Sequence, residues 1–197
     1  MERVRIFVDF WNLQINVNEH APNGYMLDWK KLSPYLVQEA KSILASSLRF
    51  DGTNVYISYN PAAPKDANLR QWSINVLDRF PGINVVLKER EYKHPPTCPQ
   101  CHKSLEVCPY CGVKMVGTVE KGIDTAIVTD MIKLAWEDAW DVAILISSDR
   151  DFIPLIEFLT NKGRRVINVC FPPKGMHLAR VCWASIDLRS HLAALSR

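Results

Sequence analysis

Long apolar runs are missing from this chain of 197 residues, and their absence limits what the protein can be. No stretch approaches the roughly 20 consecutive apolar residues of a transmembrane helix, so we expect no membrane partner. The first residues pass directly into a strand pattern, so the sequence predicts no signal peptide. The expected location is therefore the reducing cytoplasm, where paired cysteines act as metal ligands or redox centres rather than as disulfides.

A strong excess of charge of one sign is missing as well. The formal net charge is +3, with 48% hydrophobic and 23% charged residues, which is ordinary usage for a globular protein. This small positive excess is compatible with a nucleic-acid partner but is weak evidence for one. We find neither an internal repeat nor a low-complexity tail, and the length suits one α/β domain with a sizeable core.

Strand and helix patterns alternate along most of the chain. Strands are predicted at residues 3–8, 54–59, 83–87, 142–146 and 165–169. Helices are predicted at residues 27–48, 66–80 and 123–138 and from residue 152 to near Gly163, with two short helices at 176–183 and 190–195. Such alternation predicts a parallel sheet of about five strands with right-handed crossovers. The common doubly wound strand order, 3-2-1-4-5, would place the first strand in the middle.

Carboxylates stand at three corresponding places in this pattern. Asp9 directly follows the first buried strand, and Asp149 lies in the turn between the fourth strand and its helix. These two strands are neighbours in the expected order, so both residues should meet at the carboxyl edge of the sheet. Asp124 begins the helix that leaves the same edge. The sequence therefore predicts three converging carboxylates from distant parts of the chain.

Gathered carboxylates repel one another, and a divalent cation is the usual way to offset that repulsion. Oxygen ligands without nearby His or Cys suit Mg²⁺ or Mn²⁺, so Asp9, Asp124 and Asp149 are the expected ligands of one of these cations. The other residues predicted for this catalytic site are Asp151, Asp130, Asn12 and Ser147. Each aspartate taken singly is more simply a solvated turn residue or helix cap, whereas three on one sheet edge favour a metal site.

Three sequence blocks resemble the signatures of NYN domains in the PIN-like nuclease superfamily, with the LabA-like group most similar. The blocks begin at Asp9, Lys121 and Ser147 and occur in the expected order, and the resemblance extends over nearly the whole chain. The resemblance implies a Rossmann-like PIN fold and metal-dependent cleavage of RNA. It places the acidic centre at Asp9, Asp124 and Asp149, together with Asp130 and Asp151. It implies a single domain, residues 1–197.

Residues 93–119 interrupt the alternation and are predicted to be a small zinc-binding insertion. Two Cys-x-x-Cys pairs lie in this segment with six residues between them, at Cys98, Cys101, Cys108 and Cys111. Two such knuckles complete a tetrahedral Zn²⁺ site with no open position, so the expected zinc is structural. A redox dithiol would need one pair at the start of a βαβ unit, which is not the arrangement here.

Basic and aromatic residues accompany the cysteine pairs. Bases of single-stranded RNA could stack on exposed tyrosine rings, and lysine or arginine could bind its phosphates. The residues predicted to bind nucleic acid are Arg90, Lys93, Lys103, Lys114 and Tyr110. A basic surface that is exposed to solvent on a zinc-bound loop, without a nucleic-acid ligand, explains these residues equally well.

Two functions from different classes remain open. The first is a metal-dependent ribonuclease, expected to be an endonuclease, and the second is a non-catalytic RNA-binding or regulatory module. A phosphoacceptor domain is disfavoured, because the third strand ends in Leu87-Lys88-Glu89 where that class needs an acceptor aspartate. The sequence leaves the oligomeric state undetermined, with a homodimer still open.

Overall fold

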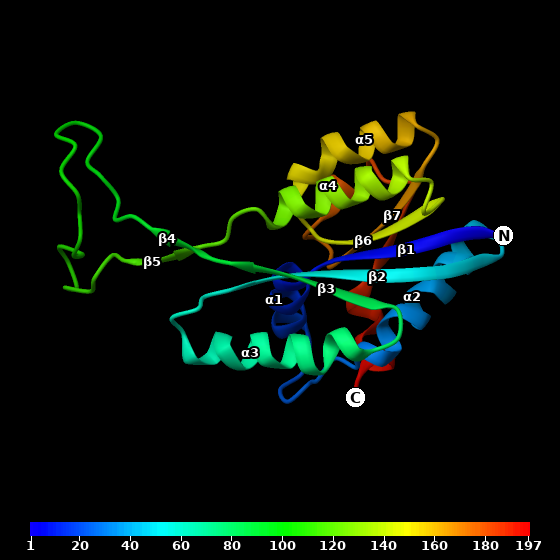
Figure 1. Ribbon diagram of the computed structural model, residues 1–197, viewed down its shortest axis with the longest axis horizontal. Helices are drawn as coiled ribbons and strands as arrows, with labels where there is room; N and C mark the ends of the chain where they lie inside the picture. Colours follow the sequence, from blue (N-terminus) through cyan, green and yellow to red (C-terminus); the bar gives the residue numbers. More distant parts are fainter.

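The computed structural model describes residues 1–197, and its centre is a parallel sheet in the order β3-β2-β1-β6-β7-β8 (Figure 1). The strands are β1 (Glu2–Asp9), β2 (Leu48–Tyr59), β3 (Ile83–Glu89), β6 (Val142–Ile146), β7 (Arg165–Cys170) and β8 (Ala184–Asp187). The predicted α/β class, the parallel sheet and the central position of the first strand are confirmed. The five predicted strands also take the predicted order, and β8 adds a sixth at the edge.

Helices cover both faces of the sheet, as Figure 1 shows. One face carries α1 (Phe10–His20), α2 (Trp29–Leu44) and α3 (Pro64–Asn75), and the other carries α4 (Ile123–Trp136), α5 (Ile153–Asn161) and α6 (Met176–Ala179). Short 3₁₀ segments lie at Leu77–Arg79, Arg150–Phe152 and Leu188–Leu195. Successive strand residues alternate between two cores: Ile6 packs on the α1–α2 side and Phe7 on the α4–α5 side. Burial of both faces explains why the central strands read as continuous apolar runs.

Two elements of the body have no counterpart in the prediction, and the bounds of others differ, since α2 ends at Leu44 rather than at 48 and β2 begins at Leu48 rather than at 54. Helix α1 was not expected, because its sequence is rich in asparagine, a residue with modest helix propensity. It forms nevertheless, since Leu13 and Val17 are buried against the sheet. Strand β8 lies between the two short helices predicted near the end of the chain. It was not predicted, because four residues give too little alternation to indicate a strand.

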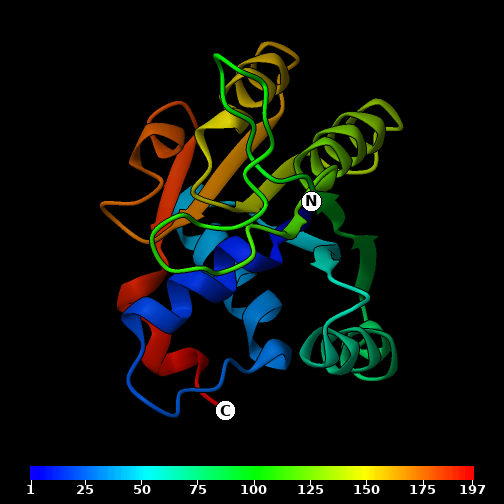
Figure 2. The same ribbon diagram turned by 90° about the vertical axis from the view of Figure 1, so that its left-hand side faces the viewer.

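An arm projects from the body at the carboxyl edge of the sheet (Figures 1 and 2). Its base is an antiparallel pair of strands, β4 (Glu91–Lys93) and β5 (Gly117–Val119). The segment predicted to be an insertion, 93–119, lies in this arm. The body therefore consists of the strand–helix units on either side of the arm.

The arm contains an internal repeat, so our expectation of no repeat was wrong. Residues 97–106 and 107–116 each begin with the same turn, and their backbone hydrogen bonds match after a shift of ten residues. The Cys98 amide donates to the Lys103 carbonyl, and the Cys108 amide donates in the same way to Val113. Each turn also holds one residue at positive φ at the equivalent position, His102 at 57° and Gly112 at 70°. The repeat escaped detection because only the Cys-Pro-x-Cys core is shared in sequence.

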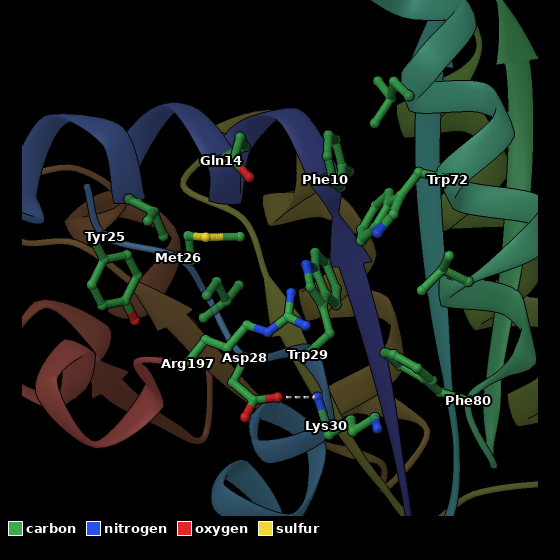
Figure 3. Close-up of a pocket in the computed structure, with 14 residues that line it drawn as sticks. Phe10, Gln14, Tyr25, Met26, Asp28, Trp29, Lys30, Trp72, Phe80 and Arg197 are labelled. Atoms are coloured by element: carbon green, nitrogen blue, oxygen red, sulfur yellow. Dashed lines mark hydrogen bonds between the residues drawn. The ribbon is translucent and has the colours of Figure 1, made fainter. Parts of the chain in front are cut away.

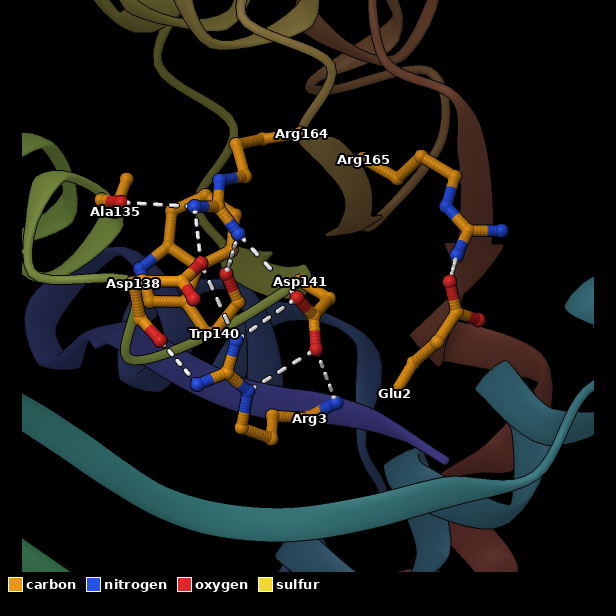
Figure 4. Close-up of polar contacts among 8 residues, drawn as sticks. All are labelled: Glu2, Arg3, Ala135, Asp138, Trp140, Asp141, Arg164 and Arg165. Atoms are coloured by element: carbon orange, nitrogen blue, oxygen red, sulfur yellow. Dashed lines mark hydrogen bonds and ion pairs between the residues drawn. The ribbon is translucent and has the colours of Figure 1, made fainter.

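Charged residues join the elements at the opposite, amino edge of the sheet (Figure 4). Arg3 on β1 and Arg164 before β7 both pair with Asp138 and Asp141, which flank the turn that leads into β6. The Arg164 guanidinium also lies 5.8 Å from the centre of the Trp140 ring. This network connects three strands at the edge remote from the arm.

Candidate functional site

Asp9 ends β1 and is the most deeply placed of the predicted carboxylates, with 6% of its surface exposed. Its Oδ1 accepts a hydrogen bond from the Asn12 amide at 3.2 Å, which caps α1, and its Oδ2 accepts one from Ser147 Oγ at 3.3 Å. Burial, followed by the negative charges of Glu120 and Asp124, raises the pKa of Asp9 to about 7 against the opposing effects of the hydrogen bonds from the Asn12 amide and from Ser147. The fold thus holds a carboxylate where its charge is poorly compensated.

The loop after β6 is tied to the end of β1 by two predicted residues. Ser147 Oγ donates to Asp9 and accepts from the Asp149 amide at 3.2 Å. Asn12 Oδ1 accepts from the Ser148 amide at 2.9 Å, and Asp149 Oδ1 accepts from the Asp151 amide at 2.9 Å. Asn12 and Ser147 therefore fix the positions of Asp9 and Asp149 relative to each other.

Asp124 brings the third chain segment to the same edge. It lies in the first turn of α4, and its pKa is raised by burial and then by the charges of Asp149, Glu120 and Asp151. No Lys, Arg or His forms an ion pair with Asp9, Asp124, Asp149 or Asp151. The three chain segments thus bring aspartates to one edge of the sheet, where no basic side chain pairs with them.

Glu120 is a further acidic residue at this site, and sequence reasoning missed it. It joins β5 to α4, and its carboxylate accepts a hydrogen bond from Ser58 Oγ at the end of β2. Its charge contributes to the raised pKa of both Asp9 and Asp124. Only the return of the arm to the body places Glu120 here, and no strand-end motif marks it in the sequence.

Arg90 lies on the other side of the base of the arm. Its Nε donates to Ser58 Oγ at 3.0 Å, and its guanidinium lies 5.0 Å from the centre of the Trp11 ring. Its terminal nitrogen is 4.0 Å from Glu120, while Trp11 Nε1 is anchored on the Ser58 carbonyl at 2.7 Å. A cation predicted to bind nucleic acid is thus positioned at the rim of the acidic centre.

Asp130 makes a different contact. It is six residues beyond Asp124, which is about 9 Å along a helix axis, and it accepts a hydrogen bond from Tyr56 on β2 at 2.8 Å. The burial of the ring and this bond together raise the pKa of Tyr56. The structure therefore connects Asp130 to the sheet rather than to the other aspartates.

The donor atoms suit the two kinds of metal that the sequence predicts. Carboxylate oxygens match Mg²⁺ or Mn²⁺. In the arm, backbone amides of Cys101 and Gln100 lower the pKa of Cys98, and amides of Tyr110 and Cys111 lower that of Cys108, which favours the thiolates that Zn²⁺ binds. In the structure no three Cys, His, Asp or Glu side chains lie in one group able to hold a metal ion. Both metals thus remain predictions.

The remaining predicted nucleic-acid contacts lie along the arm. All four side chains are solvent-exposed, and the ring of Tyr110, at the second turn, is 98% exposed. They are Lys93, Lys103, Lys114 and Tyr110. The structure leaves these side chains accessible to a ligand and places only Arg90 beside the carboxylates.

Comparison with known proteins gives a family and a fold. The family model described as NYN domain matches residues 3–189. The chain is similar to a solved protein of unknown function, VPA0982 from Vibrio parahaemolyticus, with 19% identity, a TM-score of 0.53 and coverage of 95% of this chain and 94% of that one. A Glycyrrhiza uralensis glycosyltransferase, UGT73P12, has a TM-score of only 0.28, with 11% identity over 86% of this chain and 28% of that one. No curated protein matches the sequence. No helix is both long and apolar enough to span a bilayer.

Proposed function

The chain belongs to the NYN domain family, whose members are generally nucleases, and we propose that it is a metal-dependent ribonuclease. The observation that carries the proposal is the set of uncompensated carboxylates at the carboxyl edge of the sheet. Asp9, Asp124 and Asp149 come from three distant segments, and no basic side chain pairs with them. Such a cluster is unfavourable without a cation.

The aspartates would hold Mg²⁺ or Mn²⁺, which when bound activates water and neutralises charge on a phosphodiester. Asn12 and Ser147 keep Asp9 and Asp149 in place through the hydrogen bonds described above. Asp151, next to Asp149 in the same turn, adds negative charge near Asp124. Arg90 is positioned to meet an RNA phosphate at the rim. We further propose that the cleavage is endonucleolytic.

The arm is proposed to be a zinc-stapled module within a single NYN domain. Cys98, Cys101, Cys108 and Cys111 would hold one structural Zn²⁺, and the exposed Lys93, Lys103, Lys114 and Tyr110 would contact single-stranded RNA. A four-thiolate donor set supports zinc rather than magnesium. Cysteines held as metal ligands are compatible with the reducing cytoplasm.

The second candidate function is an RNA-binding or regulatory module without turnover. The observation in its favour is the Arg90–Glu120 contact, because a cation at 4.0 Å already compensates part of the acidic charge. Such a module would bind RNA through Arg90 and the arm, with the carboxylates keeping only a structural role. Cleavage separates the two candidates.

The deciding experiment measures cleavage of single-stranded and structured RNA with Mg²⁺ or Mn²⁺. Asp149→Asn removes one charge while keeping the shape of the side chain, so cleavage should fall by orders of magnitude. The matched control is Asp187→Asn, since Asp187 also accepts an amide hydrogen bond as a cap, from Arg189 at 3.0 Å, outside the acidic centre. Equal cleavage by wild type and Asp149→Asn, or none by wild type, would favour the binding module.

A further inference from the structure

A groove of about 630 Å³ opens on the face of the sheet that carries α1, α2 and α3, away from α4. Figure 3 shows its walls: Phe10 and Gln14 on α1, Trp29 and Lys30 at the start of α2, and Trp72 on α3. The volume lies within the range of about 300–1,000 Å³ that is usual for small-molecule sites. None of the roles proposed for the acidic centre or for the arm involves the residues of this groove.

Aromatic rings dominate the walls. Phe10 and Trp29 are stacked, with ring centres 6.0 Å apart and planes within 12°. Trp72 lies 6.2 Å from Trp29 at an angle of 60°, and it is only partly buried although Trp29 is almost fully so. A planar ligand could therefore add to a stack that the protein has already ordered, which keeps the entropy cost of binding low.

Two cations line the same groove, and no acidic side chain forms an ion pair with either of them. No ion pair involves Lys30 or Arg197, and Lys30 Nζ lies 5.2 Å from the centre of the Phe80 ring. Asp28 is the one acidic residue in the wall, but its carboxylate accepts the Lys30 amide at 2.9 Å and lies 3.8 Å from Lys31. Arg197 is one of the residues that line the groove (Figure 3). The ligand that complements these walls is aromatic and anionic.

We propose that this groove binds a nucleotide, with the base stacked among Trp29, Trp72 and Phe80 and a phosphate held by Lys30 and Arg197. A purely apolar ligand would leave both cations unused, and inorganic phosphate would leave the rings uncovered. Base–aromatic stacking and phosphate–cation pairing are the two interactions that the walls provide together. The proposal does not rest on the ribonuclease activity, because neither interaction uses the acidic centre.

The groove and the acidic centre nevertheless share the first turn of α1. Asp9 caps this helix from the acidic side, and the next residue, Phe10, places its ring in the groove. The bound nucleotide could be free or one unit of an RNA strand, since both present the same base and phosphate. The experiment must therefore offer both sources.

Tryptophan fluorescence in EDTA gives a direct readout, because two of the six tryptophans line the groove. The probes are AMP, adenosine, ribose 5-phosphate and a single-stranded RNA pentamer. AMP should quench saturably and bind at least tenfold more tightly than adenosine or ribose 5-phosphate. Lys30→Ala with Arg197→Ala should weaken AMP binding at least tenfold and leave adenosine unchanged, while Trp72→Ala should weaken both.

The control is Lys162→Ala, which removes a lysine that lies 5.9 Å from the Phe158 ring on α5, outside the groove. AMP binding should be unchanged in this variant, and EDTA removes any cation from the acidic centre, so the outcome is independent of the nuclease proposal. Saturable binding of AMP or of the RNA pentamer that is lost in the double variant supports nucleotide binding in the groove. The probe that binds more tightly shows whether the ligand is a free nucleotide or part of an RNA strand. No saturable quenching by either, or quenching unaffected by the double variant, overturns it.

Discussion

A buried carboxylate among other carboxylates weakens a fold, and the acidic centre contains this arrangement. Asp9 has hydrogen bonds from Asn12 and Ser147 but no cation, and its pKa of about 7 reflects the work of charging it there. Structural roles alone would be filled equally well by asparagine, which caps helices as effectively as aspartate. The aspartates thus carry an electrostatic penalty that capping does not require.

Asp124→Asn should leave the apo protein as stable as wild type or more stable, by up to about 1 kcal/mol, because repulsion with Asp149 and Glu120 is relieved. Thermal melts in EDTA measure this change. In wild type, Mn²⁺ should raise the melting temperature by mass action, and the variant should lose most of that shift. A clearly destabilised variant in EDTA, or a wild type indifferent to Mn²⁺, would contradict the cation site.

The residues that could be predicted are those at strand ends. Asp9 and Asp149 follow buried strands, and parallel topology makes such positions neighbours. Glu120 could not be found in this way, because its place depends on how the arm returns to the body. Asp130 was included through the family resemblance and its place on a helix, and helical spacing alone could not reveal its bond to Tyr56.

Among the elements, the arm shows how a short motif determines backbone shape. Each Cys-Pro-x-Cys turn closes with the same hydrogen bonds and a residue at positive φ, although most other residues of the two repeats differ. Helix α1 and strand β8 show the opposite case, since tertiary packing forms them where local signals are weak. Long, buried strands were predictable because burial on both faces leaves a continuous apolar run.

The arm should contain one Zn²⁺ per chain. Protein purified without added zinc should show near-stoichiometric metal by elemental analysis, because four thiolates outcompete other ligands for this ion. Cys98→Ser combined with Cys101→Ser should remove it, whereas Cys170→Ser, which changes a buried cysteine of β7, should not. A disulfide or absent metal in the intact protein would rule out the zinc site.

The lysines of the arm should affect RNA binding more than the chemical step. Lys93→Ala, Lys103→Ala and Lys114→Ala together should reduce the salt dependence of binding by about 0.7 for each phosphate that the arm no longer neutralises. Titration with single-stranded RNA at several salt concentrations gives this slope. The control is Lys41→Ala on α2, outside the arm. An unchanged affinity and slope would place the RNA elsewhere on the molecule.

In the molecule as a whole, the two ends of the parallel strands carry charged residues in different arrangements. Acidic residues without partners gather at the carboxyl edge, while Arg3, Arg164, Asp138 and Asp141 compensate one another at the amino edge (Figure 4). The compensated charges of the amino edge therefore stabilise the fold, whereas the unpaired carboxylates of the other edge are available to bind a ligand.

Acid should weaken this network. Hydrogen bonds from Arg3 lower the pKa of Asp141, so its contribution to stability is present above the ordinary aspartate pKa near 4 and is lost as the pH falls through the lowered folded-state value. Asp141→Asn should destabilise the protein by about 2 kcal/mol at pH 7, with a smaller difference near pH 3. Denaturant melts across this range measure the change. A difference that does not shrink in acid would contradict the network's role.

The pairing at the base of the arm has a consequence for how this fold can vary. Glu91 and Val119 are antiparallel partners, so the two chain ends of the arm leave the body side by side, within about 5.5 Å. A tight turn could join them, and equally a longer structure of another kind could be grafted between them without changing the sheet order. Any structure inserted at this place would lie beside the acidic centre, so a change of the insertion could alter which nucleic acid reaches the carboxylates while the body stays the same.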